Sequence, residues 1–228
     1  WFSLAALEVE RCTLTQVIVA LGDSITDGRG ATTDGNDRWT DNLARRLQAD
    51  PKRRNMAIVN QGIGGNRLLQ DGLGPNALAR LDRDVLAQPG VRALILLEGI
   101  NDIGTLTREA PASAADHAEL VKRMTGAYRQ IIARARSRGI KVIGGTILPF
   151  AGNGYYHPDA ANEADRQAVN QWIRTPGHFD AVIDFDRALR DPAWPDRLLP
   201  RYDSGDGLHP SPAGYRAMAD AIPLGLFP

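Results

Sequence analysis

Short apolar runs of strand length recur along the chain, and longer amphipathic stretches separate them. Most of the runs are rich in Val, Ile and Leu and do not alternate with polar residues, which is typical of strands buried on both faces of a parallel sheet. This pattern predicts a central, mostly five-stranded parallel sheet. The runs are Val17–Leu21, Met56–Val59, Ala93–Leu97, Ile140–Ile143 and Ala181–Ile183.

Between the runs, apolar residues recur every three or four positions, which is the spacing of an amphipathic helix. Each stretch ends before a Pro or a Gly, the residues that commonly stop a helix. Ser211 followed by Pro212 suits the cap and first turn of a final helix. Because strands alternate with helices, we expect a three-layer α/β/α sandwich with right-handed crossovers. The helical stretches are residues 39–47, 78–86, 120–132 and 168–173.

The length of 228 residues suits one domain with a full-sized core. Residues 1–16 do not fit the alternation, and we expect an N-terminal extension there, either an added strand or the tail of a preceding domain. Residues 17–228 are expected to form the main domain. The extension lacks the basic start and small-residue cleavage site of a signal peptide. The compartment stays open, with a lean towards a secreted or periplasmic protein.

Composition narrows the possible partners. Hydrophobic residues make up 43% of the chain and charged residues 24%, which is ordinary for a globular protein. The 27 basic and 27 acidic residues balance, so charge gives no case for a nucleic acid or an anionic membrane as partner. No apolar run approaches the roughly 20 residues that span a bilayer. The single cysteine, Cys12, excludes an internal disulfide.

Polar, glycine-rich segments follow three of the predicted strands, and a histidine-containing loop precedes the final helix. Ligands of an open parallel sheet bind at the carboxyl ends of its strands, so these segments are expected to form one site. Glu98 ends a strand that should be buried, and its carboxylate needs a partner that the sequence does not identify. The segments are Gly22–Asp27, Asn60–Asn66, Glu98–Asp102 and Asp206–Pro210.

Ser24, His209 and Asp206 have the residue types of a nucleophile, a base and an orienting acid. A serine hydroxyl is a weak nucleophile until a base takes its proton, and the base needs a partner that fixes its tautomer. Asp206 and His209 can supply both functions from one short loop, and the carboxylate is expected to raise the pKa of His209. The order along the chain is that of α/β-hydrolases, but the Gly-x-Ser-x-Gly motif of that fold is missing.

Three groups are candidates for an oxyanion hole, which stabilises the tetrahedral intermediate of acyl transfer. They are the backbone N–H of Ser24, a backbone N–H at Gly65 and the side-chain amide of Asn101. Gly65 also suits a turn with positive φ, and Asn101 also suits a helix cap. From the residues alone, both alternatives stay open.

Four motifs resemble, in order, the signature blocks of the SGNH hydrolases, the family of GDSL-type esterases and lipases. They read GDSIT, NQGIGGNR, GIND and DGLHP, and the resemblance runs from about residue 17 to the C-terminus. It implies a flavodoxin-like sandwich and a serine esterase that forms an acyl-enzyme, with no metal or organic cofactor. Ser24 is implied as nucleophile and first oxyanion donor, with Gly65 and Asn101 as the other donors. Asp206 and His209 complete the implied catalytic triad.

The substrate class is less constrained, because the family that the chain resembles includes carbohydrate acetylesterases, lysophospholipases, thioesterases and arylesterases. Aromatic residues make up only 6% of the chain, and no long apolar insertion offers a lipid lid. We therefore favour short acyl groups, such as acetyl, on polar or carbohydrate alcohols. Hydrolysis of longer acyl chains, acyl transfer to another acceptor and a non-catalytic carbohydrate-binding module are the alternatives.

Candidates for substrate binding lie near the predicted triad. They are Asp23, beside the nucleophile, and Tyr155, Tyr156 and His157, in a loop after the fourth predicted strand. In contrast, His117 opens a long helix in a polar stretch and is expected to be solvated.

Aspartates gather after the first predicted strand and suggest a cation site. Their spacing matches no calcium loop, so solvated or helix-capping roles are favoured and no metal site is predicted. They are Asp23, Asp27, Asp34, Asp37 and Asp41.

Overall fold

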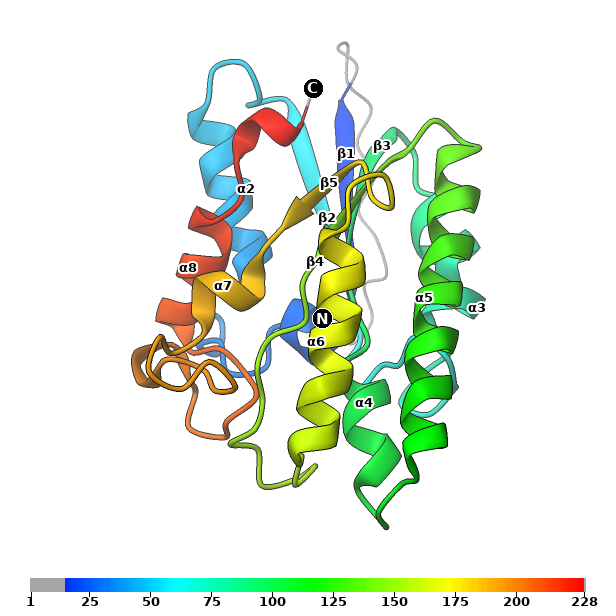
Figure 1. Ribbon diagram of the computed structural model, residues 1–228. Coiled ribbons are helices and arrows are strands. Elements are labelled where there is room, and N and C mark those ends of the chain that lie inside the picture. The colour runs from blue at the N-terminus through cyan, green and yellow to red at the C-terminus, as the bar shows by residue number, and fades with distance from the viewer. Residues whose placement is uncertain (1–14, 228) are drawn as a thin grey trace.

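The computed structural model, which describes residues 15–227, is built around a parallel sheet of five strands (Figure 1). The strand order is β2-β1-β3-β4-β5, and every neighbouring pair is parallel. The predicted α/β sandwich is thereby confirmed, and each predicted run lies in one of the strands or overlaps it. The strands are β1 (Gln16–Gly22), β2 (Met56–Gly62), β3 (Val91–Leu97), β4 (Lys141–Gly145) and β5 (Ala181–Ile183).

The two central strands explain why the sequence pattern is continuous rather than alternating. In β1 and β3 the last residues are buried on both faces, because helices cover the sheet from either side. β1 pairs with β3 in a register that puts Gly22 beside Leu97. The segments that follow these two strands, one with Ser24 and the other with Asn101, therefore leave the sheet side by side.

Helices cover both faces of the sheet (Figure 1). On one face, α8 packs against α2 and α7; on the other, α5 packs against α3, α4 and α6. The first group is α2 (Trp39–Ala49), α7 (Phe185–Leu189) and α8 (Pro212–Asp220). The second group is α3 (Ala77–Leu81), α4 (Ile100–Thr107), α5 (Ala114–Arg136) and α6 (Ala160–Arg174).

The predicted apolar stripes lie inside α2, α5 and α6, although α5 and α6 begin several residues earlier, and α4 is not predicted. The start of the final helix agrees with the sequence. The hydroxyl of Ser211 accepts a hydrogen bond from the Gly214 N–H at 3.2 Å, at the start of α8. The stripe over residues 78–86 is split, since α3 ends at Leu81 and a π-helical turn continues from Asp82 to Leu86. The short elements have no apolar periodicity to reveal them. These are α1 (Ser24–Asp27), α7 and the 3₁₀ turns Pro200–Tyr202 and Leu224–Leu226.

The expectation of an N-terminal extension concerns residues that lie almost entirely outside the described part of the chain. β1 begins at Gln16, so the strand takes in the last residue of the proposed extension. Within residues 15–227, no helix is both long enough and apolar enough to cross a membrane.

Candidate active site

Ser24 lies where the first strand gives way to a short helix. β1 ends at Gly22, Asp23 occupies the N-cap position, and Ser24 is the first residue of α1. The Asp23 carboxylate accepts a hydrogen bond from the Ile25 N–H at 2.9 Å, which fixes the turn. The Ser24 hydroxyl is thus held at the carboxyl edge of the sheet.

A hydrogen-bonded chain joins Ser24 to the loop before α8. Ser24 Oγ lies 2.8 Å from His209 Nε2, and His209 Nδ1 lies 2.6 Å from Asp206 Oδ2. The other carboxylate oxygen of Asp206 accepts hydrogen bonds from the backbone N–H groups of Leu208 at 3.0 Å and His209 at 2.8 Å. The loop therefore folds around the carboxylate, which holds the imidazole in one orientation.

Burial and hydrogen bonding oppose each other at this pair. Burial lowers the pKa of His209 because it disfavours the imidazolium, and this outweighs the opposite effect of Asp206. The pKa of His209 therefore lies below its ordinary value, and the expectation of a raised pKa is wrong. For Asp206, burial alone would raise the pKa, but the hydrogen bonds from His209 and Leu208 keep it below its ordinary value. At neutral pH the pair is a neutral imidazole beside a carboxylate.

Asn101 is inside a helix and does not cap it. Gly99 holds the N-cap position of α4, and Asn101 is the second helical residue. Its amide nitrogen donates to the Asn66 carbonyl at 2.7 Å, and its amide oxygen accepts from the Tyr156 hydroxyl at 2.7 Å. An amide nitrogen has two hydrogens, so one remains for a ligand in the cleft that Asn101 lines.

The glycine-rich loop after β2 lines the same cleft as Ser24 through Gly64 and Gly65. Gly65 has a φ of +72°, the left-handed region that favours glycine. The buried carboxylate of Asp102 anchors the same loop, accepting hydrogen bonds from the N–H groups of Leu68 at 2.7 Å and Leu69 at 3.0 Å. Burial raises the pKa of Asp102 to about 6, although these two bonds act against it.

Arg80 lies beneath the site and is the partner that Glu98 requires. No sequence motif marks it. Its side chain is fully buried and lies 3.2 Å from Glu98 Oε1. The same guanidinium donates to the carbonyls of Gly22 at 2.9 Å and Gln61 at 2.7 Å, and to Asn66 Oδ1 at 2.9 Å. Arg80 thus ties together the carboxyl ends of β1, β2 and β3.

Although Arg80 is cationic, the pKa values of Glu98 and Asp23 near it are raised. Burial and the nearby charge of Asp23 raise the pKa of Glu98 well above its ordinary value, against the effect of Arg80. Burial also raises the pKa of Asp23 to about 7, with Asp102 adding to the shift. Burial of neighbouring carboxyl groups therefore favours protonation of some of them near neutral pH, although Arg80 acts against it.

Ser24 and His209 line a cleft of about 1420 Å³ at the carboxyl ends of the strands. Gly65, Asn101 and Asp206 line the same cleft, so the five residues predicted for the triad and the oxyanion hole come together.

Only two of the four candidate substrate-binding residues line the cleft. Tyr155 and Tyr156 line the cleft, with Tyr155 60% exposed and Tyr156 buried. Asp23 and His157 do not line it: the side chain of Asp23 is buried beneath Ser24 as a helix cap, and His157 is exposed outside the lining.

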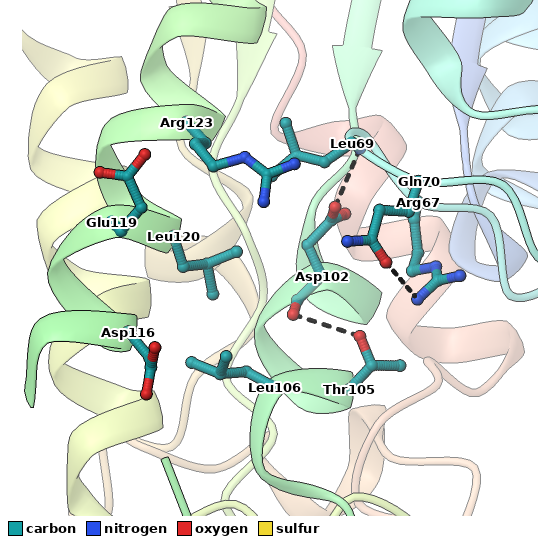
Figure 2. A pocket seen from close by; sticks show the side chains of 10 residues that line it. All are labelled: Arg67, Leu69, Gln70, Asp102, Thr105, Leu106, Asp116, Glu119, Leu120 and Arg123. Atoms are coloured by element: carbon teal, nitrogen blue, oxygen red, sulfur yellow. Dashed lines mark hydrogen bonds between the residues drawn. The ribbon is translucent and has the colours of Figure 1, made fainter. Parts of the chain in front are cut away.

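A smaller chamber of about 320 Å³ adjoins this cleft, and Arg67 and Thr105 line both. Figure 2 shows its walls, with the Asp102 carboxylate bonded to the backbone of Leu69 and side chains of α5 opposite. The α5 residues are Asp116, Glu119, Leu120 and Arg123. The chamber mixes cationic, anionic and apolar groups, and we assign no ligand to it.

The aspartates that follow β1 do not converge. Asp41 belongs to the capping box of α2, and Asp37 Oδ1 accepts from the Thr32 N–H at 3.0 Å. Among the residues from 15 to 227, no group of three or more His, Cys, Asp or Glu side chains is arranged to hold a metal ion.

His117 differs from expectation. It is 8% exposed rather than solvated, and its Nδ1 lies 2.5 Å from Asp165 Oδ2. This pair connects α5 with α6, away from the cleft. The polar residues that precede His117 face solvent, while His117 itself faces the neighbouring helix, a distinction that requires knowledge of the packing.

The fold agrees with that of known proteins. A GDSL-like lipase from Bacteroides thetaiotaomicron is 21% identical, with a TM-score of 0.62, and the match covers 91% of this chain and 85% of that one. An acetylxylan esterase from Geobacillus stearothermophilus is 22% identical, with a TM-score of 0.65, over 91% of this chain and 93% of the other. At such identities these likenesses show the fold. A search of curated proteins gave no match.

The family is established by sequence. Residues 20–217 match the model of the GDSL-like Lipase/Acylhydrolase family, and the chain belongs to that family. The protein is therefore a carboxylic ester hydrolase.

Proposed function

We propose that the protein hydrolyses short-chain esters, above all acetyl esters, of polar or carbohydrate alcohols through an acyl-enzyme on Ser24. The observation that carries the proposal is the hydrogen-bonded chain of Ser24, His209 and Asp206 at the floor of an open cleft.

In the first half-reaction, His209 Nε2 takes the Ser24 proton while Ser24 Oγ attacks the ester carbonyl carbon. The resulting tetrahedral intermediate collapses, the bond from the carbonyl carbon to the alcohol oxygen breaks, and the alcohol leaves with the proton from His209. In the second half-reaction, water loses a proton to His209 and attacks the acyl carbon. The bond from that carbon to Ser24 Oγ then breaks, the acid leaves, and His209 returns the proton to Ser24 Oγ. Asp206 orients the imidazole and stabilises its charged form in both steps.

The negative charge on the former carbonyl oxygen needs donors that are already in place. We assign this role to the backbone N–H groups of Ser24 and Gly65 and to the free amide hydrogen of Asn101. Tyr156 is a positioning residue in this scheme, because its hydroxyl donates to the amide oxygen of Asn101 at 2.7 Å and so fixes which way the amide nitrogen points.

The cleft supports a small acyl group on a bulky polar alcohol. Much of its lining consists of glycine, asparagine and charged residues rather than a continuous apolar channel. The acetylxylan esterase with the same fold acts on an acetylated polysaccharide, as its name states, which agrees with this class of substrate. A second candidate is hydrolysis of longer acyl chains, which the exposed side chains of Leu73 and Tyr155 on the cleft wall favour.

A series of p-nitrophenyl esters from acetate to laurate, run beside acetylated xylo-oligosaccharides, separates the two candidates. We expect the highest kcat/KM for acetate or butyrate and release of acetate from the oligosaccharides. A maximum at octanoate or longer would instead assign Leu73 and Tyr155 to an acyl-binding surface. In the Ser24→Ala variant every activity should vanish while the circular dichroism spectrum stays unchanged, and retained turnover would refute the assignment of the nucleophile.

A further inference from the structure

The charges that line the catalytic cleft are not balanced, although the 27 basic and 27 acidic residues of the whole chain are. Arginines outnumber carboxylates in the lining, so the excess belongs to the cleft rather than to a generally basic protein. The charged lining residues are Arg29, Arg67, Arg108, Arg197, Asp203 and Asp206.

Both carboxylates of the cleft are already engaged. Asp203 Oδ1 accepts hydrogen bonds from the N–H groups of Gly205 at 2.8 Å and Gly207 at 3.1 Å. Asp206 holds His209. Neither carboxylate has a close hydrogen bond to an arginine of the cleft, since the nearest, Arg29 Nε, lies 4.0 Å from Asp206 Oδ2.

The arginines differ in how far they are committed to neighbours. Arg108 donates hydrogen bonds to Glu109 and to the Tyr155 hydroxyl, both at 2.7 Å. Arg67 donates a hydrogen bond to the Asp71 carbonyl. Arg197 has no side-chain hydrogen bond or ion pair with any residue in the described range 15–227. Its guanidinium is therefore available to a ligand.

The backbone around Arg197 is nevertheless fixed. Its N–H donates to the Trp194 carbonyl at 2.9 Å, and its own carbonyl accepts from the Asp191 N–H at 2.9 Å. Leu198, the next residue, is buried. The exposed guanidinium is therefore carried on an ordered loop.

The loop of Arg197 lies on the side of the cleft from which the alcohol leaves. Segment 151–153 bridges it to the catalytic loop: the Ala151 N–H donates to the Asp196 carbonyl at 3.0 Å, and Asn153 Nδ2 donates to the Asp206 carbonyl at 2.9 Å. His209 must hand its proton to the departing alcohol oxygen, so the alcohol part of the ester lies on the side of His209.

We propose that the cleft selects esters whose alcohol part carries an anionic group, such as an acetylated sugar acid, and that Arg197 is the residue that determines this specificity. The planar guanidinium presents paired N–H donors that match the oxygens of a carboxylate or a sulfonate. Arg29, 71% exposed and close to Asp206, adds to the positive field on the same side. The inference rests on the proposed function, because it assumes that the ester carbonyl lies at Ser24.

Three aryl acetates of similar shape test the proposal: para-acetoxybenzoate, para-acetoxybenzenesulfonate and the neutral methyl para-acetoxybenzoate. The quantity to compare is kcat/KM for each anion divided by that for the neutral ester, in the wild type and in Arg197→Gln, so that intrinsic reactivity cancels. We expect the ratio to fall about two- to fivefold in the variant, the size of one exposed charge pair. The anion whose ratio falls more identifies the preferred group.

Arg92→Gln is the matched control, since Arg92 is an exposed arginine at the amino end of β3, far from the carboxyl edge that carries the cleft. It should leave the ratio unchanged. Added salt should lower kcat/KM for the anions more than for the neutral ester. An equal ratio in wild type and Arg197→Gln would overturn the inference and leave the proposed function intact, whereas loss of the proposed function would show as a failure to hydrolyse the neutral ester.

Discussion

The molecule contains two histidine–carboxylate pairs with almost the same Nδ1–Oδ2 distance, and in both the imidazole is buried. His209 Nδ1 lies 2.6 Å from Asp206 Oδ2, and His117 Nδ1 lies 2.5 Å from Asp165 Oδ2. The first pair faces a cleft and has a serine hydroxyl at its other ring nitrogen. The second joins two helices, and within residues 15–227 its other ring nitrogen has no hydrogen-bond partner. The contact with a carboxylate is common to both histidines, so the proposed role of His209 as base rests on the serine hydroxyl and the cleft beside it.

The carboxylates differ as much as the surroundings do. Two backbone N–H groups and one imidazole converge on Asp206, and these hydrogen bonds keep its pKa low despite burial. Asp165 has only His117 as hydrogen-bond partner in the described range, and burial raises its pKa. A carboxylate that must steady an imidazolium needs donors of its own, and the tight loop from Asp206 to His209 supplies them.

The largest expected effect distinguishes the two histidines directly. His209→Ala should lower kcat for p-nitrophenyl acetate by a factor of about 10⁴ or more, because within residues 15–227 His209 is the only side chain hydrogen-bonded to Ser24 Oγ. His117→Ala should leave kcat per folded molecule close to the wild-type value. Comparable losses of kcat in both variants would mean that the pair of His117 and Asp165 affects catalysis in the cleft, and would contradict its assignment as a purely structural pair.

The next effect concerns the proposed oxyanion donors, which lie at the cleft beside Ser24 and His209 and have no counterpart in the proposal for the His117 pair. Asn101→Ala should lower kcat about a hundred- to a thousandfold with little change in KM, since the carbonyl oxygen gains its charge in the transition state. Tyr156→Phe keeps the ring and removes the hydrogen bond to Asn101, so it should lower kcat by a smaller factor. A thermal melt of each variant separates this role from stability: a lower Tm with unchanged turnover would rule it out.

The sequence predicts the sheet, and brings forward the proposed catalytic residues, for physical reasons. Strands buried on both faces leave uninterrupted Val, Ile and Leu runs, so β1 and β3 are recognisable from composition alone. Ser24 and Asn101 directly follow these strands, and Asp206 and His209 are three residues apart, so the relevant groups lie in short motifs. Glu98 is recognisable as a buried acid in need of a partner.

What the sequence does not predict depends on distant contacts. Arg80 lies in a short helical stripe, and its partners include backbone carbonyls at the ends of two other strands, Gly22 and Gln61, which no motif encodes. The partner of His117 is 48 residues away on another helix. The direction of the His209 pKa shift depends on how deeply the ring is buried, which is a property of the packed molecule.

The pH dependence of kcat/KM reports the pKa of the proposed base, His209. Because burial lowers the pKa of His209, the neutral imidazole that acts as base persists below the ordinary value of 6.5. The acid limb of kcat/KM should therefore have its midpoint below 6.5 and fall about tenfold per pH unit beneath it. The charge of Arg29 also lowers this pKa, so Arg29→Gln should move the limb to higher pH when measured with a neutral ester. A midpoint above 6.5 in the wild type would mean that Asp206 outweighs burial.

The smallest expected effect on catalysis, and the one that tests the structural pair itself, comes from a double-mutant cycle at His117 and Asp165. His117→Ala leaves the Asp165 carboxyl group buried without its partner, which should cost about 1–3 kcal/mol of the free energy of unfolding. Asp165→Ala should cost a similar amount, because the imidazole then loses its only hydrogen-bond partner in the described range. If the two side chains stabilise the protein mainly through each other, the double variant should be destabilised by less than the sum of the single variants.

Urea unfolding measures the free energies, and kcat with p-nitrophenyl acetate should stay within about twofold in all three variants, since neither side chain lines the cleft. Strict additivity would show that the two residues stabilise α5 and α6 independently, and a fall in kcat beyond tenfold in the folded variants would show that this pair supports the catalytic site after all.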